Sequence, residues 1–359
     1  MKKVSGYLEI LAQNSGFLRS IDNGFMPQNG DIYLSANMLR RYKLREGAFV
    51  EGLAEENSTK NMAAQLVEII KVNGKTLKEY EQIKEFKSQT SINPHERINL
   101  QIDAGDITGA VLNYITPIGK GQRGLIISPP KTGKTTILKH IAKAICKNEP
   151  KSDLAILLVD ERPEEVTDFR RSITHGVVLA SSADESVQNH LRITRLTMSA
   201  AMRKAEAGED VVVLIDSLTR MGRAFNKESG NSGRTMSGGL ASNALELPRR
   251  FYGAARKIED GGSLTVIATI LVDTGSQMDQ VIFQEFKGTG NMDLKLSQEC
   301  AEKRIFPAIN INESGTRKEE LLLDEDELRK TMKLRRFLSE LGEVEAMNHL
   351  LKIIEGERS

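Results

Sequence analysis

The segment Gly124-Leu-Ile-Ile-Ser-Pro-Pro-Lys-Thr-Gly-Lys-Thr-Thr136 decides the fold of this chain. An apolar strand runs into a loop, and the loop leads into Ile137–Lys147, which has the pattern of a helix. The loop matches GxxxxGK[ST], except that Ser128 stands in place of the first glycine. Loop N–H groups and a helix N-terminus hold phosphates, so the segment predicts nucleotide binding. The alternative is a chance lysine-rich turn, and the flanking strand and helix argue against it.

The predicted nucleotide site has a basic and an acidic part. Lys134 would reach the β and γ phosphate oxygens, and the Thr135 hydroxyl would hold Mg²⁺. Val211–Asp216 is a hydrophobic strand that ends in an acid, and Asp216 would bind the same ion directly or through water. The spacing of the two segments is typical of a RecA-like core, so ATP and Mg²⁺ are the expected cofactors. The other loop residues expected at the nucleotide are Lys131, Thr132, Gly133 and Thr136.

A further acidic cluster follows the apolar run Leu154–Val159. A carboxylate at the carboxyl end of a strand beside the phosphate loop can orient the attacking water, and Glu161 is the candidate. The alternative is a charged helix N-terminus with Pro163 at its first position. Both interpretations hold together if the later glutamates serve the helix and Glu161-Arg162 faces the site.

Strands alternate with helices through the C-terminal two thirds, which predicts a mainly parallel α/β sheet. The continuous apolar runs expected as strands are Leu125–Ser128, Leu154–Val159, Val211–Ile215 and Leu264–Leu271. One intervening helix is expected over Glu185–Ala207, with a capping box that starts at Ser182 and a terminating Gly208.

The N-terminal part has a different pattern, with short alternating stretches separated by turn residues, which predicts a small barrel of about five strands. These stretches are Tyr7–Leu11, Gly16–Arg19, Asp31–Leu34, Phe49–Leu53 and Leu66–Val72. A polar, lysine-rich segment follows. We therefore expect a barrel over residues 1–75, a linker over 76–114 and an ATPase domain over 115–359.

Composition restricts the class of protein. The chain has 359 residues, and its 50 Lys and Arg against 49 Asp and Glu provide no overall field that attracts nucleic acid. No apolar run approaches the roughly 20 residues of a membrane helix, and the N-terminus lacks a signal-peptide pattern. We expect a cytoplasmic protein with no membrane partner. Cys146 and Cys300 have no metal-ligand neighbours, which predicts two reduced thiols.

Six stretches make a more specific pattern. They are SPPKTGKT at 128–135, VDERPEEV at 159–166, DSLTR at 216–220, FYGAAR at 251–256, FKGTGNM at 286–292 and SGTRKEELL at 314–322. Generic nucleotide-binding proteins share only the first and third. With these stretches the chain resembles the transcription termination factor Rho family, over essentially its whole length. Many family members carry a helical segment ahead of the barrel, and this sequence begins almost at the barrel.

The resemblance implies an OB or cold-shock-like RNA-binding barrel followed by a RecA-like P-loop ATPase domain. It implies a homohexameric ring that has ATP sites at subunit interfaces and moves along single-stranded RNA to strip transcripts from the RNA polymerase elongation complex. Elongation factors are further possible partners.

The same resemblance assigns roles to residues outside the phosphate loop. Arg317 resembles an arginine finger delivered to a neighbour's γ-phosphate, Arg304 a second interface arginine, and Phe306 a stacking surface for adenine. The residues that would complete the nucleotide pocket are Gly119, Lys120, Gly121, Gln122, Arg123 and Gly124. By composition alone, Arg317 reads as an ordinary surface arginine beside Lys318.

Two RNA-binding regions are implied. In the barrel, Phe17 and Tyr33 would stack on bases and Arg19 would meet phosphate. The whole barrel set is Asn14, Ser15, Gly16, Phe17, Leu18, Arg19, Asp31, Ile32, Tyr33, Lys60, Asn61 and Met62. The family usually has aromatic residues where this chain has Ser15 and Met62, so less stacking is expected here. For Phe17, core packing and base contact remain open.

The second region is the central channel of the ring. One channel loop is expected at Arg234, Thr235, Met236, Ser237, Gly238 and Gly239, and another contains Thr274 and Gln277. The family commonly has Lys at the position of Gln277. Solvated surface connections are the alternative for both loops.

Two rival functions have testable differences. Another hexameric RecA-like ATPase, such as a rotary or secretion ATPase, would hydrolyse ATP without RNA, and Pro129-Pro130 and the barrel strip argue against it. A non-enzymatic RNA-binding relative would have lost turnover, and the presence of Lys134, Glu161 and Arg317 argues against that.

Overall fold

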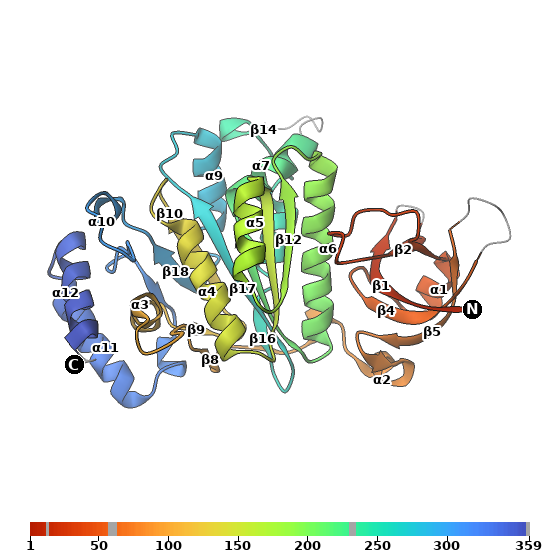
Figure 1. The fold of residues 1–359 in the computed structure, drawn as a ribbon, viewed down its shortest axis with the longest axis horizontal. Coiled ribbons are helices and arrows are strands. Elements are labelled where there is room, and N and C mark those ends of the chain that lie inside the picture. The colour runs from red at the N-terminus through yellow and green to blue at the C-terminus, as the bar shows by residue number, and fades with distance from the viewer. Residues whose placement is uncertain (12–13, 57–62, 230–234, 357–359) are drawn as a thin grey trace.

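The computed structural model describes residues 1–11, 14–56, 63–229 and 235–356, and only the backbone of 235–237. Figure 1 shows a small barrel at one end, a central sheet covered by helices, and two C-terminal helices at the other end. The order of elements along the chain follows the alternation that the sequence predicts.

The N-terminal barrel is confirmed. Its sheet has the order β3-β2-β1-β4-β5-β6, and a parallel pairing of Tyr33 with Gln65 joins β3 to β5 and closes it. Alternate residues such as Leu8, Leu18 and Leu34 point into the barrel core and are buried. The elements are β1 (Lys2–Ile10), β2 (Gly16–Arg19), β3 (Ile32–Leu34), α1 (Ala36–Arg41), β4 (Phe49–Glu55), β5 (Gln65–Val72) and β6 (Lys75–Thr76).

The large sheet is mainly parallel, as predicted. Along the path β12-β11-β13-β17-β10-β18-β19 of the described residues, the edge strand β19 alone is antiparallel to its neighbour. Off this path, β16 (Arg256–Ile258) pairs antiparallel with β17, and β7 (Ser91–Ile92) pairs antiparallel with β16. The strands are β10 (Arg123–Ser128), β11 (Asp153–Glu161), β12 (Val177–Ser182), β13 (Asp210–Asp216), β17 (Ser263–Leu271), β18 (Met292–Lys295) and β19 (Gly315–Thr316). Because parallel strands end at one edge, Ser128, Glu161 and Asp216 lie at the same edge of the sheet.

Helices cover both faces of the sheet and bury it in two cores. One face carries α3 (Ile107–Ile115), α4 (Lys134–Asn148), α5 (Pro163–Ser172), α11 (Glu325–Leu338) and α12 (Glu343–Gly356). The other carries α6 (Val187–Glu206), α7 (Leu218–Ser229), α8 (Glu246–Tyr252) and α9 (Gln277–Phe286). Short elements between them are β9 (Ile118–Gly119), β14 (Thr235–Met236), η2 (Ser237–Gly239), β15 (Leu240–Ala241), β16 (Arg256–Ile258), α10 (Gln298–Glu302) and η3 (Glu319–Leu321).

The predicted start of α6 is wrong. The helix begins after Ser186, whose hydroxyl accepts from the Asn189 N–H, whereas Ser182 is the last residue of β12. Only half of the expected capping box forms. The Glu185 carboxylate accepts from the Ser182 N–H at 2.9 Å, but the Ser182 hydroxyl does not cap the helix. Residues 183–185 turn between strand and helix, so the cap lies one turn later than the pattern indicates.

Residues 76–114, expected as a linker, contain short elements, of which the first packs on the barrel strand β5 and the later ones pack on the ATPase domain. They are α2 (Leu77–Gln82), η1 (Phe86–Ser88), β7 (Ser91–Ile92), β8 (Arg97–Ile98) and α3. Phe86, Ile98 and Leu100 are buried in the two sheet cores, which anchors an otherwise polar segment. We propose that the two domains divide within this segment.

The barrel packs tightly against α6. Tyr7 and Phe25 of the barrel are buried in the same core as the apolar face of α6. Gly47 has a φ of +80°, and a Cβ there would lie 2.4 Å from the Ala200 backbone nitrogen. Only glycine therefore allows this close approach of the barrel to the helix. No helix in the part of the chain that is described is long and apolar enough to cross a membrane.

Candidate functional site

The phosphate loop between β10 and α4 has the conformation that its sequence predicts. Gly133 precedes α4 with a φ of +92°, so the first N–H groups of the helix face the loop without a side chain between them. The Ser128 hydroxyl lies 2.9 Å from that of Thr132, which also donates to the Pro129 carbonyl at 2.8 Å. Ser128 thus takes the position of the usual glycine and ties the two ends of the loop together.

Asp216 lies under this loop and is fully buried. Its Oδ1 accepts from the Lys134 ammonium and from the Thr269 hydroxyl, the latter at 2.8 Å. Its Oδ2 is buried and has no hydrogen-bond partner among the described residues. The Thr135 hydroxyl, at the start of α4, donates to Glu165 Oε2 at 3.3 Å. A hydroxyl and an unpartnered carboxylate oxygen beside a phosphate loop are oxygen ligands that fit Mg²⁺.

Glu161 ends β11 next to Asp216 and is 2% exposed. Burial, and then the negative charge of Asp216, raises the pKa of Glu161 to about 7, against the opposing effects of Arg220 and Lys134. A carboxyl with a pKa near neutrality can accept a proton from water under working conditions. Glu161 therefore has the environment of a general base.

Arg220 is a site residue that the sequence interpretation missed. Its Nη2 lies 3.0 Å from Glu161 Oε2, and its Nη1 donates to the carbonyl of Asp160. Arg220 lies on the first turn of α7 and is the last residue of the stretch DSLTR. It is a charged residue outside the phosphate loop, and no role was assigned to it from the sequence. Its spacing of one helical turn after Asp216 is the signal that could have identified it.

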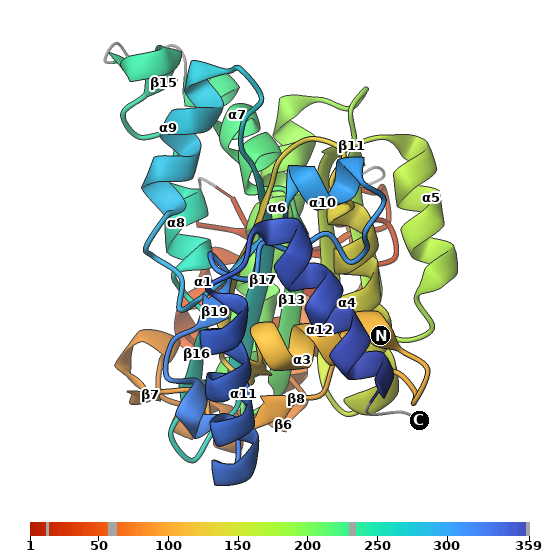
Figure 2. The same ribbon diagram turned by 90° about the vertical axis from the view of Figure 1, so that its left-hand side faces the viewer.

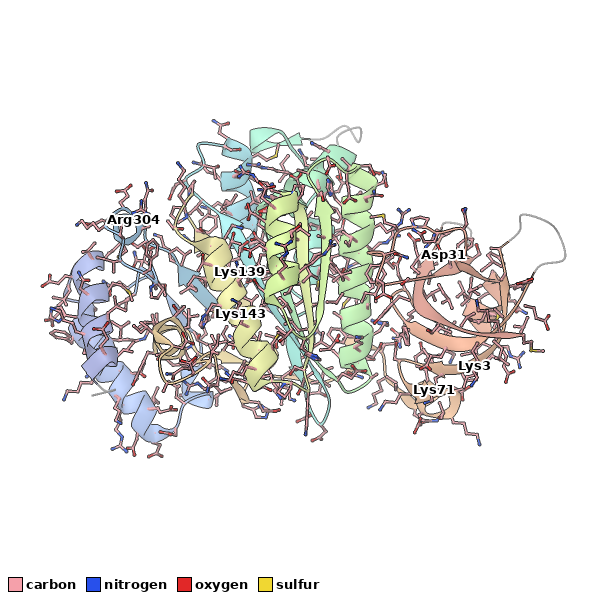
Figure 3. The ribbon with its side chains drawn as sticks, in the orientation of Figure 1. Lys3, Asp31, Lys71, Lys139, Lys143 and Arg304 are labelled. Atoms are coloured by element: carbon pink, nitrogen blue, oxygen red, sulfur yellow. The ribbon has the colours of Figure 1, made fainter. Side chains whose placement is uncertain are left out.

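Three further residues expected at the nucleotide are exposed, and one of them, Phe306, lies beside the loop. A Cβ placed on Gly133 would lie 4.0 Å from ring carbon Cε1 of Phe306, and Phe306 is 50% exposed. The ring is therefore close to the phosphate loop and open to solvent. Arg304 is exposed on the turn after α10 (Figure 3), and Arg162 is exposed just ahead of α5.

Gly119–Gly124 and Arg317 lie at the opposite end of the sheet from the phosphate loop. Arg123 begins β10 and Ser128 ends it, a separation of about 17 Å at ~3.3 Å per residue. Asn291 joins the two segments: its side-chain oxygen accepts from the Arg123 N–H at 2.9 Å, and its carbonyl accepts from the Arg317 N–H at 2.9 Å. Within one chain, these predicted nucleotide residues are not brought to the phosphate loop.

The barrel strip places Phe17 and Tyr33 side by side, half-buried, with ring centroids 5.6 Å apart. Arg19 corrects an expectation, because its side chain is only 7% exposed and pairs with Glu9 and Asp31. Its charge is already neutralised, so it is not a free phosphate ligand. The guanidinium lies 5.0 Å from the Phe17 ring centre and supports that ring.

Other predicted barrel residues differ in their exposure. Leu18 is buried in the barrel core, so its side chain is not an RNA ligand, since alternate strand residues point inward. Asn14 is exposed, Ser15, Ile32 and Tyr33 are half-buried, and Asp31 lies on the barrel as Figure 3 shows. Lys60, Asn61 and Met62 lie outside the described residues.

The structure brings the two predicted channel loops together. Gly238 has a φ of +74°, and a Cβ there would lie 3.0 Å from the Met278 N–H nitrogen at the start of α9. Gln277 is exposed, and the Thr274 hydroxyl donates to Asp279 at 2.6 Å. Arg234 lies outside the described residues, and Thr235, Met236 and Ser237 are described by their backbone alone.

Two family models match the chain. Residues 4–78 match the Rho termination factor RNA-binding domain, and residues 109–316 match the ATP synthase alpha/beta family nucleotide-binding domain. Among solved structures, a prototypical ATPase from the type III secretion system of pathogenic bacteria is similar, with a TM-score of 0.61 and 21% identity over 69% of this chain and 70% of that one. The ATP synthase subunit NeqB of Nanoarcheaum equitans gives a TM-score of 0.60 and 18% identity, over 70% of this chain and 65% of that one. These two likenesses concern the fold.

Curated relatives are similar over nearly the whole chain. The transcription termination factor Rho of Cereibacter sphaeroides is 44% identical over 99% of this chain and 84% of its own length. That of Aquifex aeolicus is 47% identical over 97% of this chain and 81% of its length. That of Streptomyces lividans is 48% identical over 99% of this chain, which spans only 50% of that longer protein.

Proposed function

The chain belongs to the transcription termination factor Rho family, and from that premise we propose that it is an RNA-dependent ATPase that translocates along nascent single-stranded RNA and releases transcripts from RNA polymerase. The observation that carries the proposal is the convergence of Lys134, Asp216 and buried Glu161 at one sheet edge, in a chain that also has an RNA-binding barrel. ATP hydrolysis measured with and without poly(C) tests it. Hydrolysis that RNA does not stimulate would favour the rotary or secretion ATPases instead.

The site residues have separate tasks in hydrolysis. The phosphate-loop N–H groups and Lys134 would bind the β and γ phosphates once the nucleotide displaces Lys134 from Asp216. Glu161 would take a proton from the attacking water, and Arg220 would hold that carboxylate against the end of β11. We propose that Thr135 and Asp216 hold Mg²⁺, which neutralises phosphate charge when bound. Phe306 would stack on the adenine, and Arg304 would lie at the boundary with the next subunit.

The pKa of Glu161 predicts a pH dependence. Glu161 acts as a base only when ionised, so kcat/KM for RNA-stimulated hydrolysis should fall as the pH drops through about 7. Arg220→Gln should move this acid limb to higher pH, because the positive charge of Arg220 lowers the pKa of Glu161. A matched Arg329→Gln variant on exposed α11 should leave the profile unchanged. An acid limb that stays in place in Arg220→Gln would contradict the role given to Glu161.

We propose that the sheet end with Arg317 and Gly119–Gly124 faces the ATP site of a neighbouring subunit in a homohexameric ring. Arg317 is exposed, and no carboxylate lies within ion-pair distance of it in the described residues. Asn291 connects it to Arg123, so both arginines belong to one rigid surface. A head-to-tail ring brings such a surface against the opposite edge of the next copy. ATP hydrolysis then depends on assembly.

The proposed partners follow from family membership and the two RNA regions. Single-stranded RNA would bind first on the barrel and then at the channel loops of Gly238–Gly239 and Thr274–Gln277. RNA polymerase and elongation factors are the proposed protein partners, and we propose a cytoplasmic location on the same ground.

The barrel here offers fewer rings than the family pattern, which predicts weak stacking. Ser15→Phe should strengthen binding of oligo(C) to the full chain about fivefold or more, since one base–aromatic stack is worth about 1–3 kcal/mol. Ser15 is half-buried beside β2, so a ring there would extend the surface of Phe17 and Tyr33. Affinities for oligo(C) and oligo(A) at two salt concentrations provide the measurement, with Ser15→Ala as the control. Equal affinities for Ser15→Phe and the unchanged chain would show that stacking at this position does not set capture.

A further inference from the structure

Seven cationic side chains and three carboxylates line two adjoining hollows where the barrel meets the ATPase domain. The first, of about 450 Å³, lies between the turn after α1 and helix α2. The second, of about 320 Å³, lies between the segment around Phe86 and helices α6 and α8. Arg45 and Glu85 line both hollows, which therefore form one groove, called here the junction groove.

Most of the positive charge in the junction groove is unpaired. Arg45 and Arg203 share one buried carboxylate, that of Glu206, at 2.6 and 3.2 Å. The other five cations have no carboxylate within 4.0 Å among the residues described; they are Arg41, Lys43, Lys87, Arg250 and Arg256. Since the whole chain has a formal charge of only +1, this is a local concentration of charge. An anionic ligand would find uncompensated partners here.

Arg256 is the clearest example of an unpaired charge in the groove that an anion could neutralise. It is half-buried, its guanidinium lies 4.7 Å from the Phe86 ring centre, and its Nε donates to the Ala254 carbonyl at 3.0 Å. Burial, and then the nearby charge of Arg123, lowers the pKa of Arg256. Arg250 similarly lies 5.5 Å from the ring of Phe251. Phe86 and Phe251 are buried, so they orient guanidinium groups and do not offer stacking faces to bases.

The groove leads from the barrel toward the channel loops. Strands β14 and β15 form an antiparallel hairpin at the first predicted channel loop, called here the channel hairpin. Helix α8 starts shortly after β15 and carries Arg250 into the groove. Arg249 on the same helix pairs with Glu285 of α9 at 2.5 Å, which fixes α8 beside the second channel loop. Figure 2 shows α8 directly below α9 and β15. One helix of seven residues, about 10 Å at 1.5 Å per residue, therefore separates the channel hairpin from the groove.

We propose that the junction groove is a third RNA contact, which binds phosphates of the strand between the barrel and the channel loops. The proposal rests on the proposed function, because that function places RNA at both ends of the groove. Planar guanidinium groups without carboxylate partners suit phosphate oxygens, and covered rings exclude base stacking. Binding in the groove is thus electrostatic and independent of sequence.

The test reverses two exposed charges of the junction groove, those of Lys87 and Arg250. Lys87→Glu/Arg250→Glu is compared with the unchanged chain for binding of oligo(C) of about 8 nucleotides, which one barrel accommodates, and of about 40 nucleotides. The matched control is Lys333→Glu/Lys352→Glu on α11 and α12, which carries the same charge change at the other end of the molecule (Figure 1). Lys87→Arg/Arg250→Lys keeps the charge and tests folding and shape.

The expected result is specific to the long RNA. In Lys87→Glu/Arg250→Glu, the slope of log affinity against log salt should fall by about 1.4, at ~0.7 per phosphate contact, with affinity on the order of tenfold lower near 0.1 M salt. The affinity of Lys87→Glu/Arg250→Glu for the 8-nucleotide RNA should be unchanged. The control pair and the charge-preserving pair should bind both RNAs as the unchanged chain does. Equal loss in the control pair, or an unchanged slope for the long RNA, would overturn the proposal. Loss of polyglutamate binding with RNA binding intact would assign the groove to an acidic protein instead. If the unchanged chain binds neither RNA, the proposed function is contradicted, and so is the RNA contact in the groove.

Discussion

Arg317→Ala is expected to lower RNA-stimulated ATP hydrolysis by about 10³–10⁵-fold, the range for arginine fingers in related NTPases. The reason is that Arg317 is exposed at the end of the sheet opposite to its own phosphate loop, which supports the proposal that it acts on a neighbour's γ-phosphate. Assembly and ATP binding should be retained, because the Arg317 side chain makes no ion pair with any described residue. Steady-state hydrolysis, nucleotide affinity and the mass of the assembly are the measurements.

Subunit mixing separates action on a neighbour from action within one chain. Arg317→Ala and Glu161→Ala subunits, each inactive alone, should recover activity when they are co-assembled. In randomly mixed rings at equal ratio, about a quarter of the interfaces pair an intact Glu161 with an intact Arg317 from the next subunit. If no ratio of the two restores turnover, Arg317 does not act across an interface. Arg329→Ala, on exposed α11, serves as the arginine control.

Glu161→Gln is expected to lower hydrolysis by about 10²–10⁴-fold with ATP affinity unchanged. Glutamine keeps the shape of the buried side chain but cannot accept the proton of the attacking water. Lys134→Ala should remove hydrolysis as well, but with weaker ATP binding, because in the proposed function Lys134 holds phosphates. Equilibrium binding of a nonhydrolysable ATP analogue and single-turnover hydrolysis distinguish the two variants. Normal turnover in Glu161→Gln would exclude this carboxylate as the general base.

The phosphate loop and the strands around it could be predicted from the sequence because their signals are local. A glycine with a positive φ, a lysine and a threonine at fixed spacing describe one turn of backbone, which forms wherever a strand precedes and a helix follows. The apolar runs of β10, β11, β13 and β17 required burial on both faces, so a parallel sheet followed. The acids at the ends of β11 and β13 then met at one edge, where Glu161 and Asp216 are found.

The start of α6 could not be read in the same way. Ser182 and Ser186 both have the composition of a helix cap, and sequence spacing does not say which one the backbone uses. The pairing of Ser182 with Glu161 in the sheet keeps it in β12, so the later serine caps the helix. A contact between strands thus decided a boundary that the local pattern left ambiguous.

The sequence by itself determined which chemical groups are present and which of them lie in local phosphate-binding and strand-end patterns. Only the tertiary structure decided what each charge does, because ion pairing and burial depend on segments far apart in the chain. Arg19 became a buried partner of Glu9 and Asp31, Arg220 became the support of Glu161, and Arg317 was placed away from its own phosphate loop. The junction groove likewise joins Arg41 to Arg256 through Arg45, across more than half of the chain. Local spacing carries no information about such neighbours, since the free energy of a charge is set by its surroundings in the folded state.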